Sequence, residues 1–553
     1  MSLTHFDVQT KIWRGPLTAP LYNPAQGIGE LLYRVLQRTP TRIAQISADT
    51  GRSITYKQLH LWSVRFAQSL TGACGLQRGD MVTVVARNGE QLAAVVFGCF
   101  MAAVPLNTLD PTFRAEDYEH MLRTVEPKAI VCDGELVAVL KVACEAAAIE
   151  PQLIVVGKRI NGYPTVDDFL LPNGMEDQYV PEHVENAAQE LAIVLCSSGT
   201  TGLSKGVCLS HAICIAHTSA LWKATDCDRV VCFSSLYWVS GLGVLLNASM
   251  AGATRIITRN SFEPRLLIDL VEQYRATTLF MPPAQALALL GDPTIGMADF
   301  SSLQLVLCGG GPVSGELKGS FERYLPKRAK FIVGYGLSEI GGGCFSTVLL
   351  YKAGAIGTPN AGVEAKIVDA AGTALDADQE GELLVRAEHV FLRYYGNPSE
   401  TAEMLDRDGW LHTGDVARYD TDGVFFAVDR RKDIIKYGGF QISPTELEAT
   451  IMQLFAGRLL MVCVTGVPVP GNDLPVALAV RQTDDGAVSG REIVDAMADT
   501  VTDFKRLRGG VFFVDSLPMT PSGKIVRRRC KEMAIALYEA ERAKGTPVRS
   551  VIV

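Results

Sequence analysis

The chain has 553 residues, of which 48% are hydrophobic and 20% are charged, and its formal net charge at pH 7 is −8. This composition is typical of a globular protein and excludes both a disordered chain and a protein whose whole surface binds nucleic acid. Its length exceeds the usual limit of a single core, so at least two domains are expected. Thirteen cysteines occur without any Cys-x-x-Cys pair, and the sequence therefore predicts neither a zinc site nor a disulfide framework.

The N-terminal third alternates between helical and strand-like patterns. The helical and strand-like segments are residues 27–38, 54–70, 81–86, 129–132 and 153–156. The apolar segment 92–106 is too short for a transmembrane helix and is interrupted by Gly98, so we expect a buried helix there. Alternation of this kind predicts an α/β fold with mainly parallel strands, whose ligands bind at the carboxyl ends of the strands.

Residues 191–209 begin as an apolar strand and continue as a loop rich in glycine and hydroxyl groups. The binding candidates in this loop are Ser197, Ser198, Gly199, Thr200, Thr201, Gly202 and Lys205. Hydroxyls, inward-turned backbone N–H groups and one lysine suit a polyphosphate. The NTPase P-loop pattern is excluded, because it requires glycine directly before the lysine and a hydroxyl directly after it, whereas Ser204 and Gly206 stand at these positions.

The α/β pattern continues after this loop and leads to two glycine-rich segments, 308–314 and 331–339. The strand-like runs are residues 229–233, 253–257, 278–281 and 303–307. Both glycine segments follow strands, so we expect Gly309, Gly310, Gly334 and Gly336 to form turns at one edge of a sheet. There, Tyr335 would stack on a purine, Ser338 would reach a phosphate oxygen and Glu339 would hold Mg²⁺.

The pattern changes to short strands between residues 354 and 428, which predicts a small β subdomain. At its end, Asp415 follows a Thr-Gly pair and is placed to accept hydrogen bonds from ribose hydroxyls. Five charged residues at 429–433 interrupt the hydrophobic pattern, and a compact α/β region follows. Residues 443–446, Ser-Pro-Thr-Glu, predict a helix start with a capping box.

The string SSGTTGLSKGV at 197–207 resembles the phosphate-binding signature of the adenylate-forming superfamily, which includes acyl-CoA synthetases, 4-coumarate:CoA ligases, beetle luciferases and adenylation domains of peptide synthetases. Further motifs that resemble this superfamily follow in the same order, at residues 334–339, 409–415, 433–448 and 518–524. The resemblance implies a large N-terminal domain, residues 1–431, with layered α/β sheets, a β subdomain, and the acyl and ATP sites. A small mobile C-terminal lid, residues 432–553, would carry the catalytic lysine.

The resemblance also implies roles for individual residues. The catalytic set would be Lys524, Lys436 and Thr200, and Lys524 would also contact ATP. Asp415 and Arg430 would bind the ribose, Gln441 would lie near the AMP phosphate, and Lys432 would be the hinge between the two domains.

An acyl pocket is implied at Tyr237, Trp238, Gly311, Gly341, Gly342 and Cys344. Trp238 stands where the CoA ligases and luciferases usually have a histidine, so we expect it to act as a hydrophobic gate or as a fixed core residue. Gly311 stands where relatives often have alanine. Together with the glycines at 341–343, it predicts a deep acyl tunnel.

The expected function is an AMP-forming ligase that activates a medium- or long-chain fatty acid as an acyl-adenylate and transfers the acyl group to CoA. ATP and CoA would be co-substrates and Mg²⁺ the cofactor. The alternatives are a luciferase-like monooxygenase, a 4-coumarate-type aryl-CoA ligase, a stand-alone adenylation enzyme and a non-catalytic binding protein. No nucleic-acid partner is expected. The C-terminal residues RSVIV do not match the peroxisomal Ser-Lys-Leu signal, so a cytoplasmic location is expected, with the peroxisome as the alternative.

Overall fold

The structure is a computed structural model that describes residues 4–18, 20–198, 204–216, 224–430, 433–437, 440–470, 472–482, 488–519 and 525–543. The side chains of residues 197, 198, 430 and 441 are outside this description. The chain forms two compact units: Met1–Ala365 with Val385–His412, and Lys366–Leu384 with Thr413–Val553. The predicted α/β class, with a large N-terminal part and a small C-terminal part, is confirmed.

A seven-stranded sheet contains the strand that leads into the predicted phosphate loop. Its strands in spatial order are β20 (Arg393–Tyr394), β10 (Ser204–Ser210), β9 (Leu191–Ser198), β6 (Leu106–Thr108), β5 (Val82–Val85), β7 (Ala129–Asp133) and β8 (Gln152–Val156). The strands from β9 to β8 are parallel, and β10 and β20 are antiparallel additions at the edge. The parallel arrangement expected from the βα alternation is therefore present, with an antiparallel edge.

The helices of this region are α1 (Ile28–Val35), α2 (Tyr56–Thr71), α3 (Leu92–Met101), α4 (Ala115–Val125), α5 (Val137–Ala147), α6 (Val166–Phe169) and α7 (His211–Ala216). Every residue of α3 is buried, in agreement with its apolar sequence. The helix ends at Met101, and Leu106 already belongs to β6. The apolar segment 92–106 therefore contains a buried helix followed by the start of a strand, because a continuous apolar run does not distinguish the two.

A nine-stranded sheet lies in the same unit. Its order is β17 (Thr358–Pro359), β16 (Gly342–Ser346), β15 (Lys330–Leu337), β14 (Leu305–Gly309), β13 (Thr278–Met281), β11 (Arg229–Cys232), β12 (Thr254–Ile257), β3 (Ile43–Ser47) and β4 (Ser53–Thr55). The central strands from β15 to β3 are parallel. Helices α8 (Val239–Ala251), α9 (Pro264–Tyr274), α10 (Pro283–Leu290) and α11 (Gly315–Glu322) connect them.

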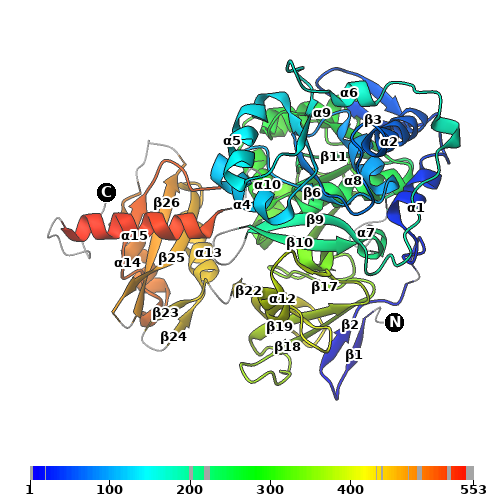
Figure 1. Cartoon of the computed structure of the whole chain (residues 1–553). Helices are drawn as coiled ribbons and strands as arrows, with labels where there is room; N and C mark the ends of the chain where they lie inside the picture. Colours follow the sequence, from blue (N-terminus) through cyan, green and yellow to red (C-terminus); the bar gives the residue numbers. More distant parts are fainter. Residues whose placement is uncertain are drawn as a thin grey trace. The chain divides into compact units, whose positions relative to one another are not determined.

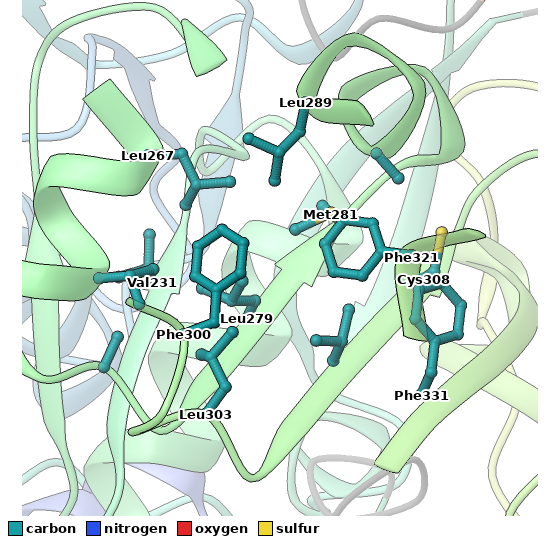
Figure 2. Packing of buried hydrophobic residues seen from close by; sticks show 14 of the residues in the cluster. Val231, Leu267, Leu279, Met281, Leu289, Phe300, Leu303, Cys308, Phe321 and Phe331 are labelled. Carbon is teal, nitrogen blue, oxygen red and sulfur yellow. The ribbon is translucent and has the colours of Figure 1, made fainter. Parts of the chain in front are cut away.

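The core beside this sheet is packed from strand and helix residues together (Figure 2). Leu279, Met281, Cys308 and Phe331 extend from β13, β14 and β15 and meet residues of the covering helices such as Phe321. Burial of such side chains contributes about 25 cal/mol per Å² of apolar surface. This packing fixes the relative positions of β14 and β15, whose carboxyl ends carry the glycine-rich segments.

A six-stranded sheet contains the predicted β subdomain. Its order is β1 (His5–Asp7), β2 (Ile12–Arg14), β18 (Val363–Val368), β19 (Gly381–Ala387), β21 (Leu411–Tyr419) and β22 (Phe425–Arg430). Helix α12 (Pro398–Met404) lies between β20 and β21 in the sequence. The participation of β1 and β2 was not predicted, because each strand is three residues long. Strand β1 pairs with β2, and β2 pairs with residues about 350 positions later in the chain.

The C-terminal region contains the hairpin β23 (Ile435–Tyr437) and β24 (Phe440–Ile442), and a sheet of β25 (Leu459–Val469), β26 (Asn472–Arg481) and β27 (Val511–Phe513). Helix α15 (Arg527–Ala543) packs on β25 and β26 (Figure 1), and α13 (Pro444–Leu454) and α14 (Gly490–Thr500) complete the region. The boundary expected between residues 431 and 432 stays a prediction, and both residues lie outside the described part. Among the described helices, none has both the length and the apolar character needed to span a bilayer.

Candidate functional site

Lys205 is held in a hairpin rather than in a loop. Strands β9 and β10 pair in antiparallel register, with Ser198 opposite Ser204 and Ser197 opposite Lys205. The predicted loop is therefore confined to the five residues between the two strands, because the strand resumes before the apolar residue Val207. The predicted ligands Gly199, Thr200, Thr201 and Gly202 lie outside the described residues, as do the side chains of Ser197 and Ser198.

The Lys205 ammonium group has an acid on one side and an aromatic ring on the other. Its Nζ atom lies 2.8 Å from Oε2 of Glu400 and 5.0 Å from the centroid of the Tyr394 ring. The two charged side chains are only 16% and 20% exposed. Limited solvent strengthens the attraction between opposite charges relative to bulk water, so the ammonium is held at a defined position.

Tyr394 connects this lysine to the predicted metal ligand. The Tyr394 hydroxyl donates a hydrogen bond of 2.7 Å to Oε1 of Glu339, and both residues are buried. Burial raises the pKa of Tyr394, and the neighbouring Glu339 charge raises it further, so the phenol stays protonated and donates. Phe391 N–H also donates to the backbone oxygen of Glu339. Lys205 and Glu339, 134 positions apart in the sequence, thus lie on either side of one tyrosine.

The two glycine segments lie side by side, as predicted. Gly309 at the end of β14 pairs with Gly334 in β15, and a Cβ atom at Gly309 would lie 2.5 Å from the oxygen of Gly334. A Cβ atom at Gly336 would lie 2.0 Å from the oxygen of Gly342. Gly310 has a positive φ of 86° and forms the expected turn. These positions need glycine because backbone approaches backbone.

The prediction of a turn at Gly334 is wrong. Strand β15 continues to Leu337 and pairs with β16 in antiparallel register. Tyr335 therefore stands on a strand, half-buried, with its ring edge to face with Phe345 at 5.8 Å between centroids. The chain turns only at Ser338, in a short 3₁₀ segment, Ser338–Ile340, that also carries Glu339. Without side chains, glycines pair as readily as they turn, and the neighbouring β16 decides between the two.

The predicted acyl residues form two groups. Tyr237 is buried and contacts Trp238, with ring centroids 4.9 Å apart at 89°. Trp238 is half-buried and directly precedes α8. Gly341, in contrast, lines an apolar cavity of about 20 Å³ with Leu209, Ile213, Cys214, Val239, Leu242, Gly243 and Leu246.

Gly311 has room for a side chain, since a Cβ atom there would lie 3.5 Å from Pro283. Gly342 has a φ of 141°, and Cys344 is fully buried in β16. The cavity beside Gly341 holds about one water molecule, so this cavity by itself is not the deep tunnel expected from the glycines. The depth of the acyl pocket stays a prediction.

The predicted ribose-binding residues are neighbours in the second unit. Asp415 in β21 pairs with Arg430 in β22 across the antiparallel ladder. Asp415 is buried, and its N–H donates to Thr413 Oγ1, which in turn donates to the oxygen of Leu383. The side chain of Arg430 lies outside the described part. The strand pairing explains how residues 15 positions apart come together.

Lys436 and Gln441 are opposite each other in the β23–β24 hairpin. The Lys436 side chain is exposed, and its backbone N–H donates to Asp473 Oδ2 at 3.3 Å. The Gln441 side chain and the predicted hinge residue Lys432 are outside the description, as is the predicted catalytic residue Lys524. The strand pairing therefore places Lys436 and Gln441, the two residues expected near the adenylate, opposite each other.

Helix α13 begins as predicted, with Ser443 Oγ accepting a hydrogen bond from Glu446 N–H. The Glu446 carboxylate does not complete the expected capping box and instead contacts Lys505 Nζ, at 2.7 Å for Oε2. A lysine from a distant segment attracts the carboxylate more strongly than a neutral backbone N–H does.

Comparison with known proteins decides the family. Residues 32–395 match the family model of the AMP-binding enzymes, and residues 456–524 match the model of the C-terminal domain of AMP-binding enzymes. The chain belongs to the AMP-binding enzyme family. The resemblance to the adenylate-forming superfamily is thereby confirmed.

Relatives of this AMP-binding enzyme have more than one activity. It is 31% identical over 511 residues to "4-coumarate--CoA ligase 3" of Arabidopsis thaliana, covering 88% of this chain and 87% of the relative. It is 29% identical over 557 residues to "Luciferin 4-monooxygenase" of Photinus pyralis, covering 96% and 99%. ATP-bound MatB from Rhodopseudomonas palustris has the same fold, with a TM-score of 0.81 at 24% identity and coverage of 92% and 99%.

Two site residues of this AMP-binding enzyme were missed from the sequence, Tyr394 and Glu400. Both lie in the part assigned only to a β subdomain, although β20 pairs with β10 and places Tyr394 opposite Val207. A signal was present, since Asn397 and Pro398 predict a helix start, and Asn397 Oδ1 accepts a hydrogen bond from Glu400 N–H. The sequence offers no signal for the pairing of β20 with β10.

Among the described residues of the AMP-binding enzyme, no group of three or more His, Cys, Asp or Glu side chains could hold a metal ion. A magnesium ion needs fewer protein ligands, because it binds one or two carboxylates together with substrate phosphates. Glu339 fits this requirement, because its buried carboxylate lies in the same side-chain cluster as the Lys205 ammonium.

Proposed function

We propose that this enzyme is an acid–thiol ligase that joins a carboxylic acid to CoA at the expense of ATP. Membership of the AMP-binding family and the likeness to a curated CoA ligase support this activity. The single observation that carries it is the cluster of Lys205, Tyr394 and Glu339, which places a cation for phosphate beside a carboxylate for a metal. Such a cluster suits the binding of Mg·ATP rather than of an uncharged ligand.

In the first step, an oxygen of the carboxylate attacks the α-phosphorus of ATP. The bond to the bridging oxygen of pyrophosphate breaks, and pyrophosphate leaves with the bonding electron pair. Lys205 binds the departing phosphates, and Lys524 stabilises the charge that develops on the α-phosphoryl oxygens. Bound Mg²⁺, held by Glu339 and phosphate oxygens, would screen the negative charge of ATP.

In the second step, the thiol of CoA gives its proton to solvent, and the thiolate attacks the acyl carbonyl carbon. The thioester bond forms as the bond to the AMP oxygen breaks. Lys524 must then leave the place that the thiol enters, and rotation at Lys432 would provide this exchange. Asp415 with Arg430 would hold the ribose, and Tyr335 would face the adenine, throughout both steps.

The proposed substrate is a medium- or long-chain fatty acid. All described residues around the cavity next to Gly341 are apolar or glycine. An alkyl chain gains about 0.8 kcal/mol for each methylene buried in such surroundings. A phenolic hydroxyl placed there would lose its hydrogen bonds to water without gaining a partner from these residues.

A 4-coumarate-type aryl acid is the second candidate. The 31% identity to the Arabidopsis 4-coumarate--CoA ligase supports it.

The test is a substrate panel of acetate, octanoate, palmitate and 4-coumarate, with formation of AMP and of the CoA ester as readouts. The fatty-acid proposal expects the highest kcat/KM for octanoate or palmitate. A lead for 4-coumarate would establish the second candidate instead. Absence of pyrophosphate release with every acid would contradict the ligase, and light emission with luciferin, ATP and O₂ would identify a monooxygenase.

Trp238 offers a sharper test of the acyl pocket. Its half-buried ring packs against Tyr237 at the start of α8. If Trp238 is a gate, Trp238→Ala should reduce the ratio of kcat/KM between palmitate and acetate by about tenfold, because small acids then profit from the opening as much as long ones do. The control is Trp410→Phe, a change at a buried tryptophan in the motif at residues 409–415. A Trp238→Ala protein that is less stable but keeps the wild-type ratio would show that Trp238 is a fixed core residue.

A further inference from the structure

The start of α15 is tied to the rest of the C-terminal unit by one buried cluster around Arg527. Arg527 is the first residue of the helix, and it follows Lys524 by three positions. Its Nη2 atom lies 2.6 Å from Glu448 Oε2 and 3.4 Å from Thr445 Oγ1, and its Nη1 atom donates to the oxygen of Val464 at 3.2 Å. One guanidinium thus reaches two residues of α13 and one of β25.

Glu448 is held from two sides. Its Oε2 atom accepts from Arg527, and its Oε1 atom accepts from Val464 N–H at 2.8 Å. Val464 therefore donates its N–H to Glu448 and accepts from Arg527 through its oxygen. The three groups form a closed ring of hydrogen bonds, so each group is held by the other two.

This arrangement corrects an unfavourable local charge. A cation in the first turn of a helix faces the positive end of the helix dipole, which is normally stabilised by acids. No acid stands in the first turn of α15. Glu448 supplies the missing negative charge from another helix, so the pair serves the position of α15 as well as its own two side chains.

The cluster lies at the base of the segment that carries Lys524. Met519 and Ile525 form an antiparallel bridge, and Val526 N–H donates to the oxygen of Pro518 at 2.8 Å. The residues on both sides of 520–524 are therefore joined to each other, and Arg527 is the next residue after this clasp. The described residues thus fix where the segment leaves the domain and where it returns.

The start of α15 is also connected, through the start of α13, to β22, the strand that precedes the predicted hinge. Asp429 Oδ2 accepts from Ser443 Oγ at 2.8 Å and from Thr445 N–H at 2.9 Å. Thr445 in turn accepts from Arg527 through its hydroxyl. A continuous series of hydrogen bonds therefore runs from residue 429, three positions before Lys432, to residue 527, three positions after Lys524.

We infer that Arg527, held by Glu448, is a positioning residue that fixes the base of the Lys524 segment and connects it to Asp429, which precedes the predicted hinge. The inference rests on the proposed function, in which Lys524 acts on the α-phosphate. Arg527 itself is anchored to protein groups on three sides. Its contribution is to orientation, and misplacement of a catalytic group by about 1 Å costs on the order of a hundredfold in rate.

The experiment measures both half-reactions in Arg527→Met, which keeps the length of the side chain and removes the guanidinium. We expect pyrophosphate release to fall by about ten- to a hundredfold, while thioester formation from a supplied acyl-adenylate falls by less than about threefold. The matched control is Arg458→Met. Arg458 also pairs with a glutamate, Glu492, at 2.8 Å, but both side chains are 44% exposed, and neither half-reaction should change.

A purely structural role would give a different result, and a double variant separates the two. Arg527→Met combined with Glu448→Leu leaves no buried charge without a partner, so it should recover the thermal stability that Arg527→Met loses. We expect adenylation to remain low in this double variant, because an apolar contact does not orient the segment as three directed hydrogen bonds do. Recovery of adenylation together with stability would overturn the inference.

Arg527→Lys provides a further readout if Arg527→Met does not fold. It keeps the charge but not the fork, so it should fold and retain an intermediate rate of adenylation. Measurements on the wild-type enzyme separate a failure of the proposed function from a failure of the role assigned to Arg527. Absence of pyrophosphate release in the wild type would contradict the proposed function, whereas an active wild type with Arg527 variants that match Arg458→Met would contradict only the role of Arg527.

Discussion

Two partly buried ion pairs, one in each unit of the chain, have similar chemistry and different consequences. Lys205 and Glu400 lie 2.8 Å apart with exposed fractions of 16% and 20%, and Arg527 and Glu448 lie 2.6 Å apart with exposed fractions of 25% and 14%. The lysine presents a compact charge to one carboxylate and one ring, whereas the arginine divides its fork among three acceptors. We expect the first pair to exchange its acid for a phosphate and the second pair to persist.

This comparison shows that distance and burial alone do not separate a binding group from a positioning group. The difference lies in how many acceptors the cation contacts and in which elements supply them. Lys205 stands near the start of β10, and we expect a phosphate to replace Glu400 there. Arg527 contacts α13 and β25, where loss of one partner would leave part of the partly buried guanidinium without a hydrogen bond.

The largest effect is expected from Lys524→Ala, which sets the upper limit for any residue that acts through Lys524. Adenylation should fall by about a hundredfold or more, because one preorganised charge is lost. Thioester formation from a supplied acyl-adenylate should largely survive. Rapid-quench measurements of both half-reactions test this, and an equal fall in both would show that Lys524 has been assigned wrongly.

Lys432→Pro tests whether the predicted lid, residues 432–553, must rotate between the two half-reactions. Proline allows one φ range, so a backbone that needs two conformations at residue 432 is blocked in one of them. We expect adenylation to persist and overall CoA-ester synthesis to fall by at least about tenfold, because the second half-reaction needs the other orientation. Lys432→Ala, which keeps both conformations, is the control. Unimpaired ester synthesis by the proline variant would contradict domain alternation.

Glu448→Gln should destabilise the C-terminal unit more than the same change at an exposed pair does. Loss of this charge leaves Arg527 partly buried without its acid, which costs about 2 kcal/mol in the free energy of unfolding. Glu492→Gln, at the exposed pair with Arg458, should cost less than about 1 kcal/mol. Urea denaturation of the two variants checks the difference. Equal losses would remove the distinction between the two kinds of ion pair.

The smallest effect is expected from Glu400→Gln. If Glu400 occupies Lys205 only until ATP arrives, its neutralisation removes a competitor for the ammonium. The KM for ATP should then fall by up to about fivefold, corresponding to about 1 kcal/mol. Glu403→Gln, on the exposed face of the same helix, is the matched control and should leave the KM unchanged. A higher KM in Glu400→Gln would show that Glu400 orients the lysine for ATP instead.

Most elements of the two α/β sheets could be predicted from the sequence. The run at 278–281 is β13 with the same bounds, and the run at 129–132 lies within β7, because short apolar runs between turns are typical of buried strands. The extension of β15 to Leu337 could not be predicted. Its glycines carry no side-chain pattern, and the strand exists because β16 returns beside it.

The candidate site divides in the same way. Lys205, Glu339, Asp415 and Lys436 were found from the sequence, because their chemistry is concentrated in short motifs with glycines and hydroxyls around them. Tyr394, Glu400, Glu448 and Arg527 were not found, because each acts through a contact with a distant segment. Glu448 is the last residue of the motif at 433–448, but its partner Arg527 lies 79 positions away.

The sequence by itself determined the family, the order of its motifs and the residue types that would meet ATP, since phosphate and metal chemistry requires particular side chains near flexible backbone. Only the tertiary structure decided which of these groups meet. Strand β20 pairs with β10 and brings Tyr394 between Lys205 and Glu339, and α15 packs on β25 and brings Arg527 to Glu448. Long-range pairing of this kind depends on packing of whole elements, and local sequence carries no record of its partner.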